Sequence, residues 1–551
     1  MLTLSGIVLY YIKCYSIFIV YIINRLYNRL FPHTGIGTVC RHTLFPIRRA
    51  AEDGFFTGEY RMVFSSLIFL YAFLPVCFVL CFLTKSIRTK NAVLLVFSLI
   101  FYAWGEPVYV LLLVGMSFFC WVFSLGIERS RSSPGAKRLW MTLAALTCIG
   151  AIGYFKYAGF ICSTVNSVCG HEILPVPSVA LPIGISFYTF QLLTYVIDVY
   201  RGDSRAQKSF RKVLLYAGLF YQCVAGPIVR YGDVEKEIEN RTINIGAVEK
   251  GLTRFIFGLG KKAVFANGCG AVVEAMILSD AQIGDASALG ANITALESCS
   301  ALTLWAGMAF YMLQIYLDFS AYSDMAIGMG LMSGFHFKEN FDYPYTSRSV
   351  TEFWRRWHIS LGSFFRDYVY IPLGGNRKGK ARQIFNMFVV WTLTGLWHGA
   401  SWNFVLWGLY FFVLLVIEKY VLGEWLGRHK ILSRVYLLAI VYFGWIFFRY
   451  TNMSLVSTFF KGMLCLNGNR LFTYEATSFL FPYLRFFIPA ALACTPVWKK
   501  LGREIRRRAG SSPVSEILFR VGDTLVPLGI LIISSLSLVG DSFNPFLYFQ
   551  F

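Results

Sequence analysis

A run of 34 residues, from Ile384 to Ile417, contains no Asp, Glu, Lys or Arg. A continuous helix of this length would extend about 51 Å at about 1.5 Å per residue, whereas the hydrocarbon core of a bilayer is about 30 Å thick. The run is therefore long enough to cross a membrane and too long for one upright helix. We expect it to tilt strongly or to break, and Gly399 is the expected position of the break.

Comparable apolar runs recur along the chain. Hydrophobic residues make up 56% of the 551 residues and aromatic residues 18%. Charged residues make up only 15%, whereas soluble proteins average about 25%. The pattern predicts an all-α polytopic membrane protein with about ten to twelve spans, some of them broken or re-entrant. The runs are Val63–Thr84, Val108–Ile127, Leu139–Phe155, Leu181–Ile197, Val213–Val229, Ala301–Leu317, Phe404–Ile417, Val435–Phe448, Phe479–Cys494 and Leu525–Val539.

The net charge of +21 would suggest nucleic-acid binding in a soluble protein, but here the basic residues lie in short stretches between apolar runs. Two such stretches, Arg201–Lys212 and Lys499–Arg508, are predicted to lie on the cytoplasmic side, beside anionic lipid. The stretch Gly270–Ala301 holds four acidic residues and no Lys or Arg, so we place it outside. We expect a multi-pass protein of the cell (inner or cytoplasmic) membrane that contacts lipid and no nucleic acid.

The first 61 residues differ in kind from the rest. Residues 3–24 are free of charge apart from Lys13, but Phe31–Arg61 resembles a loop, and no small-residue cleavage site follows the apolar stretch in the expected place. Met62 then opens a new apolar run. We expect residues 1–61 to be a dispensable N-terminal extension and residues 62–551 to form the membrane domain.

Two histidines are candidates for chemistry. His398 lies inside the uncharged run, sixteen residues after Arg382, and an ionisable side chain at such depth indicates a functional site. A neutral imidazole there would accept a hydroxyl proton as a general base. His358 lies forty residues upstream, among cations and aromatic residues. The alternatives are a packing histidine at position 398 and an interfacial imidazole at position 358.

The segment Arg348–Arg382 carries eight basic and two acidic residues, interleaved with aromatic side chains. One interpretation is a cytoplasmic amphipathic stretch whose cations reach past an aromatic belt. The other is a cationic lip in which Arg355 and Arg356 receive the phosphates of a nucleotide-bearing donor, such as a coenzyme A thioester. The two interpretations are compatible.

Other familiar sites are missing from the sequence. It contains no zinc-ligand spacing, Walker loop or dinucleotide fingerprint, so we expect no metal and no permanently bound cofactor. Asp318 and Asp324 lie six residues apart, which places them about 120° apart around a helix. Structural ion pairing and ligand contact both remain open for these two residues.

Two stretches resemble the signature pair of the membrane-bound O-acyltransferases, in the branch of the alginate O-acetylation membrane protein. They are RRWHISLGSFFRDYVYIPLGG and TGLWHGASWNFVLWG. The resemblance runs almost continuously from Met62 to Phe551, with LPIGISFYTFQLLTYVIDVYRG, AGPIVRYGDV, YLDFSAYSDMAIGMGLMSGFHFKENFDYPY and SFNPFLYFQF among the further matches. It implies about eleven helices around a funnel through the bilayer. It also implies that His398 is the main catalytic residue and that His358 is a second functional imidazole.

The predicted reaction is transfer of an acetyl group from a cytoplasmic thioester, acetyl-CoA, toward hydroxyls of an extracytoplasmic polysaccharide such as alginate. The resemblance further implies a separate extracytoplasmic esterase-like acetyltransferase as partner, together with the polysaccharide synthesis and export machinery. Three alternatives remain at this stage: D-alanyl or peptidoglycan O-acyl transfer, a secondary transporter with His398 in a proton relay, and a non-catalytic scaffold of an export complex.

Overall fold

The computed structural model describes residues 62–510, 512–540 and 546–547, and all regular structure in this part of the chain is helical. The all-α prediction is therefore confirmed for the described residues. The predicted extension, residues 1–61, lies outside them.

The helices follow one another with short connections. The first group is η1 (Phe69–Phe73), α3 (Leu74–Leu83), α4 (Ile87–Gly105), α5 (Val110–Arg129), α6 (Pro134–Ile152), η2 (Gly153–Tyr157), α7 (Ala158–Cys169), α8 (Ile185–Arg201), α9 (Phe210–Gly218) and α10 (Tyr231–Glu239). The second is α11 (Ile245–Gly260), η3 (Lys261–Ala266), α12 (Asn267–Met276), α13 (Asp280–Gly284), η4 (Ala286–Ala288), α14 (Leu289–Ser298), α15 (Ala301–Ser333), η5 (Pro344–Thr346), α16 (Val350–Arg356), α17 (Ile359–Phe365) and η6 (Arg366–Tyr370). The third is α18 (Lys380–His398), α19 (Trp402–Ile417), η7 (Glu418–Leu422), α20 (Gly423–Arg428), α21 (Lys430–Arg449), α22 (Met453–Met463), α23 (Tyr474–Ala493), α24 (Val497–Ala509) and α25 (Pro513–Gly540).

Seven of the described helices are long and apolar enough to cross a membrane, or eight if one strongly bent pair counts as a single span. The seven are Ile87–Gly105, Val110–Arg129, Pro134–Cys169, Trp402–Arg428, Lys430–Arg449, Tyr474–Ala493 and Pro513–Val539. The bent pair is Ala286–Ser298 with Ala301–Ser333, which meet at 110°. The count of about eleven, which included re-entrant helices, and the central funnel stay predictions.

One predicted span has a different structure. The run Val213–Val229 is helical only as far as Gly218, where α9 ends, and continues as turns and irregular backbone. Gly226 adopts a left-handed φ of 100°, and Pro227 has no N–H to give to a helix. An apolar composition alone therefore did not reveal that this run is a buried connection.

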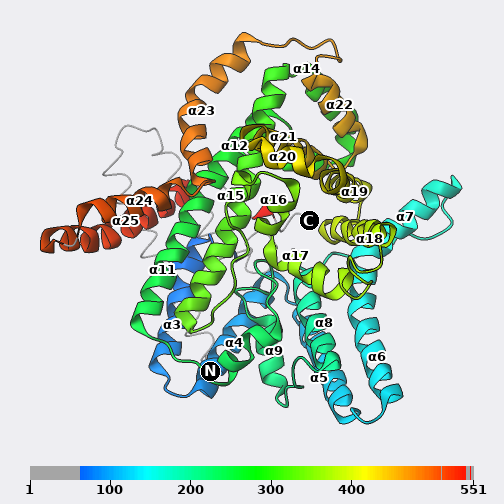
Figure 1. The fold of residues 1–551 in the computed structure, drawn as a ribbon, viewed down its shortest axis with the longest axis vertical. Coiled ribbons are helices and arrows are strands. Elements are labelled where there is room, and N and C mark those ends of the chain that lie inside the picture. Colours follow the sequence, from blue (N-terminus) through cyan, green and yellow to red (C-terminus); the bar gives the residue numbers. More distant parts are fainter. Residues whose placement is uncertain (1–61, 511, 541–545, 548–551) are drawn as a thin grey trace, which may run out of the picture.

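The longest helix, α15, runs through the middle of the molecule, and α11 packs along it (Figure 1). Ion pairs join α15 to α11 and to η3, which follows α11. Lys262 lies 2.6 Å from Asp318, and Asp324 lies 2.6 Å from Lys261 and 2.8 Å from Arg254. Both aspartates that the sequence left open are thus structural partners of cations. At the edges of the molecule, α24 and α25 project from one side and α7 from the opposite side (Figure 1).

The predicted break in the uncharged run is confirmed. Helix α18 ends at His398, Gly399 has extended backbone angles, and α19 begins at Trp402. The run therefore forms a helical hairpin instead of one overlong helix.

Two hydrophobic core clusters fill the described part of the molecule, and the chain passes from one to the other at several places, two of which involve the candidate histidines. Trp357 belongs to the second cluster and Leu361 to the first, whereas Trp397 belongs to the first and Phe404 to the second. His358 and His398 lie in these two short crossings. The packing of the bundle thus places both predicted histidines along the boundary between its cores.

Candidate active site

The hairpin that carries His398 is held together by glycine. A Cβ atom on Gly395 of α18 would collide with the backbone of Phe404, and one on Gly408 of α19 would collide with the backbone of Trp391. Only glycine allows two helices to approach this closely. The close approach fixes the end of α18, and with it the backbone of His398.

The His398 side chain lies in an aromatic cage. It is 5% exposed, and its ring meets those of Trp397, Trp407 and Phe448 edge-on, with centroids 5.0, 5.0 and 5.2 Å away. Its Nε2 atom is buried and has no hydrogen-bond partner among the described residues. A buried polar atom without a partner costs free energy, and such atoms are often found at functional sites. A nitrogen in this state is available to a substrate hydroxyl.

His358 occupies a strained backbone position between α16 and α17. Its φ and ψ angles, 47° and 53°, lie in the left-handed region, which few residues other than glycine adopt. Asn340 holds the turn: its backbone carbonyl accepts the Ile359 N–H at 2.9 Å, and its Oδ1 accepts the N–H and hydroxyl of Ser360 at 3.0 and 2.8 Å. The Ser360 hydroxyl in turn accepts the N–H of Ile228 at 2.9 Å. Backbone strain that is so fully supported is typical of functional sites.

One indole brings the two histidines together. The ring of Trp397 lies 5.5 Å from that of His358 and 5.0 Å from that of His398, edge-on to both. The side chain of His358 is 2% exposed. The sequence predicted both residues, and the fold places them at one buried site.

The two predicted donor-binding arginines differ in their surroundings. Arg356 forms an ion pair with Glu352 one helical turn earlier, at 2.8 Å, and contacts the Thr346 hydroxyl at 3.5 Å. Arg355 is exposed and forms no ion pair with any described residue. Of the two, Arg355 is therefore the one whose charge is available to a ligand.

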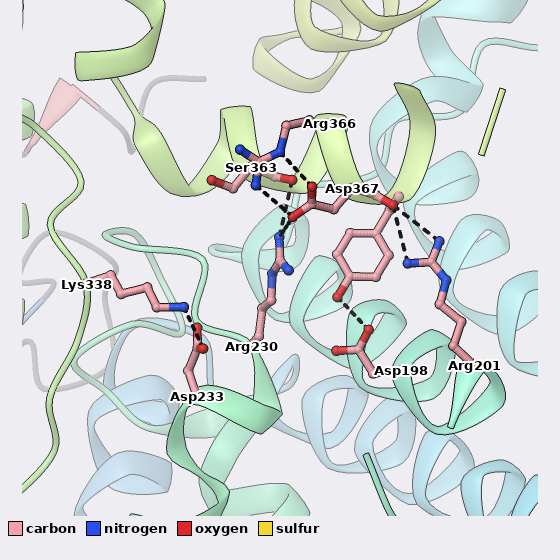
Figure 2. Close-up of polar contacts among 9 residues, drawn as sticks. Asp198, Arg201, Arg230, Asp233, Lys338, Ser363, Arg366 and Asp367 are labelled. Atoms are coloured by element: carbon pink, nitrogen blue, oxygen red, sulfur yellow. Dashed lines mark hydrogen bonds and ion pairs between the residues drawn. The ribbon is translucent and has the colours of Figure 1, made fainter. Parts of the chain in front are cut away.

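A cluster of arginines surrounds Asp367 in η6, beyond α17 (Figure 2). The carboxylate accepts hydrogen bonds from Arg230 at 2.5 Å and from Arg366 at 2.6 Å, while Arg201 donates to the Asp367 carbonyl at 3.3 Å. Burial alone would raise the pKa of Asp367, but the two guanidinium groups outweigh it and hold the pKa below its ordinary value. Several cations of this basic region thus stabilise the fold.

One further contact fastens this region to α8, and another fastens the loop after α15 to α10. The Tyr368 hydroxyl donates to Asp198 at 2.7 Å, and Lys338 lies 2.6 Å from Asp233 (Figure 2). Together with the Asp367 cluster, the Tyr368–Asp198 contact anchors the segment that follows His358.

Two residues near the histidines escaped the sequence analysis. Nothing in the sequence distinguishes Asn340, because asparagine is a common residue in loops. Lys156, by contrast, is a charged residue inside the apolar sequence GYFKYAGF, which was a signal of the same kind that singled out His398. In the structure its ammonium group reaches the end of α18. Within the described residues no group of three or more His, Cys, Asp and Glu side chains could hold a metal ion.

The match to known proteins decides the family. The model of the membrane-bound O-acyltransferase family matches residues 204–456. The "probable alginate O-acetylase AlgI" of Azotobacter vinelandii is 34% identical over 518 residues, covering 89% of this chain and the whole of that protein. The chain belongs to the membrane-bound O-acyltransferase family. It is an O-acyltransferase, and both predicted histidines lie within the matched residues.

Relatives with other names are also similar to this O-acyltransferase. The peptidoglycan O-acetyltransferase of Helicobacter pylori is 31% identical over 76% of this chain and 83% of its own length. The teichoic acid D-alanyltransferase of Streptococcus thermophilus is 27% identical over 46% of this chain and 59% of its own length. The similarity to this D-alanyltransferase thus covers about half of this chain.

Proposed function

We propose that this O-acyltransferase moves an acetyl group from a cytoplasmic thioester, acetyl-CoA, toward hydroxyls of an extracytoplasmic polysaccharide of the alginate type. The observation that carries the proposal is the buried, unpartnered Nε2 atom of His398 at the tip of the helical hairpin. The whole-length similarity to probable alginate O-acetylases supports the choice of the acetyl group and the polymer. The protein acts in the cytoplasmic membrane.

The proposed chemistry is general-base catalysis. Nε2 of His398 accepts the proton of the acceptor hydroxyl while the oxygen attacks the thioester carbonyl. The carbon–sulfur bond then breaks, and the departing thiolate takes the proton back from the imidazolium, so that an ester and a free thiol result. His358, across the Trp397 indole, assists or orients a substrate. The aromatic cage excludes water, which limits hydrolysis of the thioester.

The donor is proposed to approach through α16. Arg355 lies three residues before His358, is exposed and forms no ion pair with a described residue, so it suits the phosphates of coenzyme A. Arg356 contributes less, because Glu352 already neutralises its charge.

The acceptor side requires a partner. The segment Gly270–Ala301, which is proposed to lie outside, contains no aromatic residue on which a sugar would stack. In the structure it forms the short helices α13 and α14, and Asp280 pairs with Arg449 of α21. We therefore propose that a separate esterase-like acetyltransferase takes the acetyl group and places it on the polymer, alongside the synthesis and export machinery.

The decisive experiment supplies labelled acetyl-CoA to inside-out membrane vesicles from cells that make the polymer. Wild-type protein should label the polysaccharide, and His398→Ala should reduce labelling about 10²- to 10⁴-fold. His358→Ala should impair it less severely. His171→Ala, which changes an exposed histidine, is the matched control and should remain fully active. Near-normal labelling with His398→Ala would exclude His398 as the general base.

The partner is tested with purified protein in liposomes. Alone with acetyl-CoA it should hydrolyse the donor slowly and acetylate little polymer, and addition of the esterase-like protein should restore transfer. Efficient acetylation by this chain alone would rule out the relay. In a parallel assay with a D-alanyl thioester as donor, transfer of D-alanine with no transfer from acetyl-CoA would overturn the donor assignment.

A further inference from the structure

Two adjacent side chains reach from η2 to the end of α18. The Lys156 ammonium group donates to the carbonyl oxygens of Trp397 at 2.6 Å and His398 at 3.3 Å. The Tyr157 hydroxyl donates to the carbonyl of Leu396 at 2.7 Å. Three consecutive carbonyl groups, ending on that of His398, are thus covered by two consecutive residues.

These carbonyls are the ones that a helix end leaves without partners. The N–H of Gly399 bonds to Gly395, and α18 ends there. The last carbonyls of a helix have no intrahelical donors, and a membrane interior offers no water in their place. A cation is especially favourable at this position because the helix dipole is negative at its C-terminus.

The contacts with the α18 carbonyls are the ones that the buried Lys156 ammonium group makes. Its side chain is 9% exposed, and among the described residues it forms no ion pair with a carboxylate. A buried ammonium group without a carboxylate is costly in an apolar environment, so the α18 carbonyls supply its compensation. Exchanging Lys156 for an apolar residue would leave the carbonyls, not the lysine, without partners.

Both side chains come from an irregular stretch of backbone. Residues Gly153–Tyr157 form a π-helical turn between α6 and α7. The wider turn interrupts the α-helical spacing, and such turns are frequent at functional sites. Lys156 lies outside the residues that the family model matches.

We propose that Lys156 is a positioning residue for His398, with Tyr157 as its auxiliary. By holding the Trp397 and His398 carbonyls it fixes the end of α18, and so directs Nε2 of His398 toward the acceptor hydroxyl. This inference rests on the proposed function, in which His398 is the base. Misplacement of a reacting group by about 1 Å typically costs about 100-fold in rate, so the effect belongs in kcat and not in donor binding.

The test measures initial rates of acetyl release from labelled acetyl-CoA in vesicles containing the full-length protein and its partner. Lys156→Met should lower kcat about 10- to 100-fold and leave the KM for acetyl-CoA within about twofold. Lys156→Arg, which still donates two hydrogen bonds, should recover most of the rate. Tyr157→Phe removes a single oxygen and should lower kcat less. Lys430→Met, which changes an exposed lysine, is the control.

The outcomes separate this inference from the proposed function. If His398→Ala is inactive while Lys156→Met keeps more than half of the wild-type kcat, the positioning role is excluded and the base remains. If His398→Ala is itself active, the proposed function fails. A raised KM at unchanged kcat in Lys156→Met would show that Lys156 acts in donor binding. If Lys156→Met and Lys156→Arg lost kcat and thermal midpoint to the same extent, the role of Lys156 would be purely structural. Tyr157→Phe decides the case if both lysine variants fail to fold.

Discussion

The indole of Trp397 meets the imidazole of His358 edge-on, with ring centroids 5.5 Å apart and ring planes at 86°. Because the next residue along the chain is His398, this contact links two histidines that lie forty residues apart in the sequence. A change in the position of the Trp397 ring therefore alters the surroundings of both.

Trp397→Ala should reduce acetyl transfer strongly and lower the thermal midpoint, because removal of a buried tryptophan typically costs about 3–5 kcal/mol. Trp397→Phe retains an aromatic edge and should keep more activity. Trp498→Ala removes an exposed tryptophan and is the control. Transfer assays and thermal unfolding in detergent measure both effects. Full activity of Trp397→Ala would show that the Trp397 indole does not support the two imidazoles.

Gly395→Ala should destabilise the hairpin and abolish transfer, because the new Cβ would collide with the backbone of Phe404. A backbone atom, unlike the end of a flexible side chain, cannot move aside without moving the helix. Gly115→Ala in α5 is the matched control, since no atom lies within 4 Å of a Cβ there. The thermal midpoint should fall for the first variant and stay unchanged for the second. Equal thermal midpoints of the two variants would show that α18 and α19 can move apart with little loss of stability.

The buried ion pair of Lys262 and Asp318 predicts a non-additive pair of mutations. Each side chain is 2% exposed, so Lys262→Met or Asp318→Leu alone leaves an uncompensated buried charge, at a typical cost of about 3–5 kcal/mol. The double variant removes both charges and should be more stable than either single one. Unfolding free energies from a double-mutant cycle check this, and additive losses would contradict it.

Arg355 and Arg356 should respond differently to substitution. Arg355→Ala should raise the KM for acetyl-CoA with little change in the thermal midpoint, because this arginine forms no ion pair with a described residue. Arg356→Ala should act mainly on stability, through loss of the contact with Glu352. An unchanged KM for Arg355→Ala would remove it from the donor site.

The lowered pKa of Asp367 predicts how its contribution to stability depends on pH. A depressed carboxyl pKa stabilises the fold fully above the unfolded value, which is about 4, and the contribution is lost as pH falls through the lower folded value. Asp367→Asn should therefore lower the thermal midpoint equally at pH 7 and pH 5.5. The difference from wild type should shrink only below about pH 4, and a difference already gone at pH 5.5 would be inconsistent with the depressed pKa.

Much of the architecture was predictable from local sequence. The length of the uncharged run Ile384–Ile417 exceeds the thickness of a bilayer, which required the break that the structure has at Gly399. The prediction of a membrane span at Val213–Val229 was wrong, because hydropathy indicates burial but not backbone conformation. Lipid and the protein interior are equally apolar surroundings, so hydropathy does not distinguish them.

The sequence by itself determined the helical membrane fold and the family, and it predicted the two candidate histidines, because charge scarcity and short motifs are local properties of the chain. Only the tertiary structure decided that Trp397 joins these histidines, that Glu352 neutralises Arg356 and that Lys156 holds the end of α18. Each of these contacts joins side chains whose proximity depends on how helices pack. The carbonyl groups that Lys156 binds exist at every helix end, so the sequence around His398 carries no sign of which residue will satisfy them.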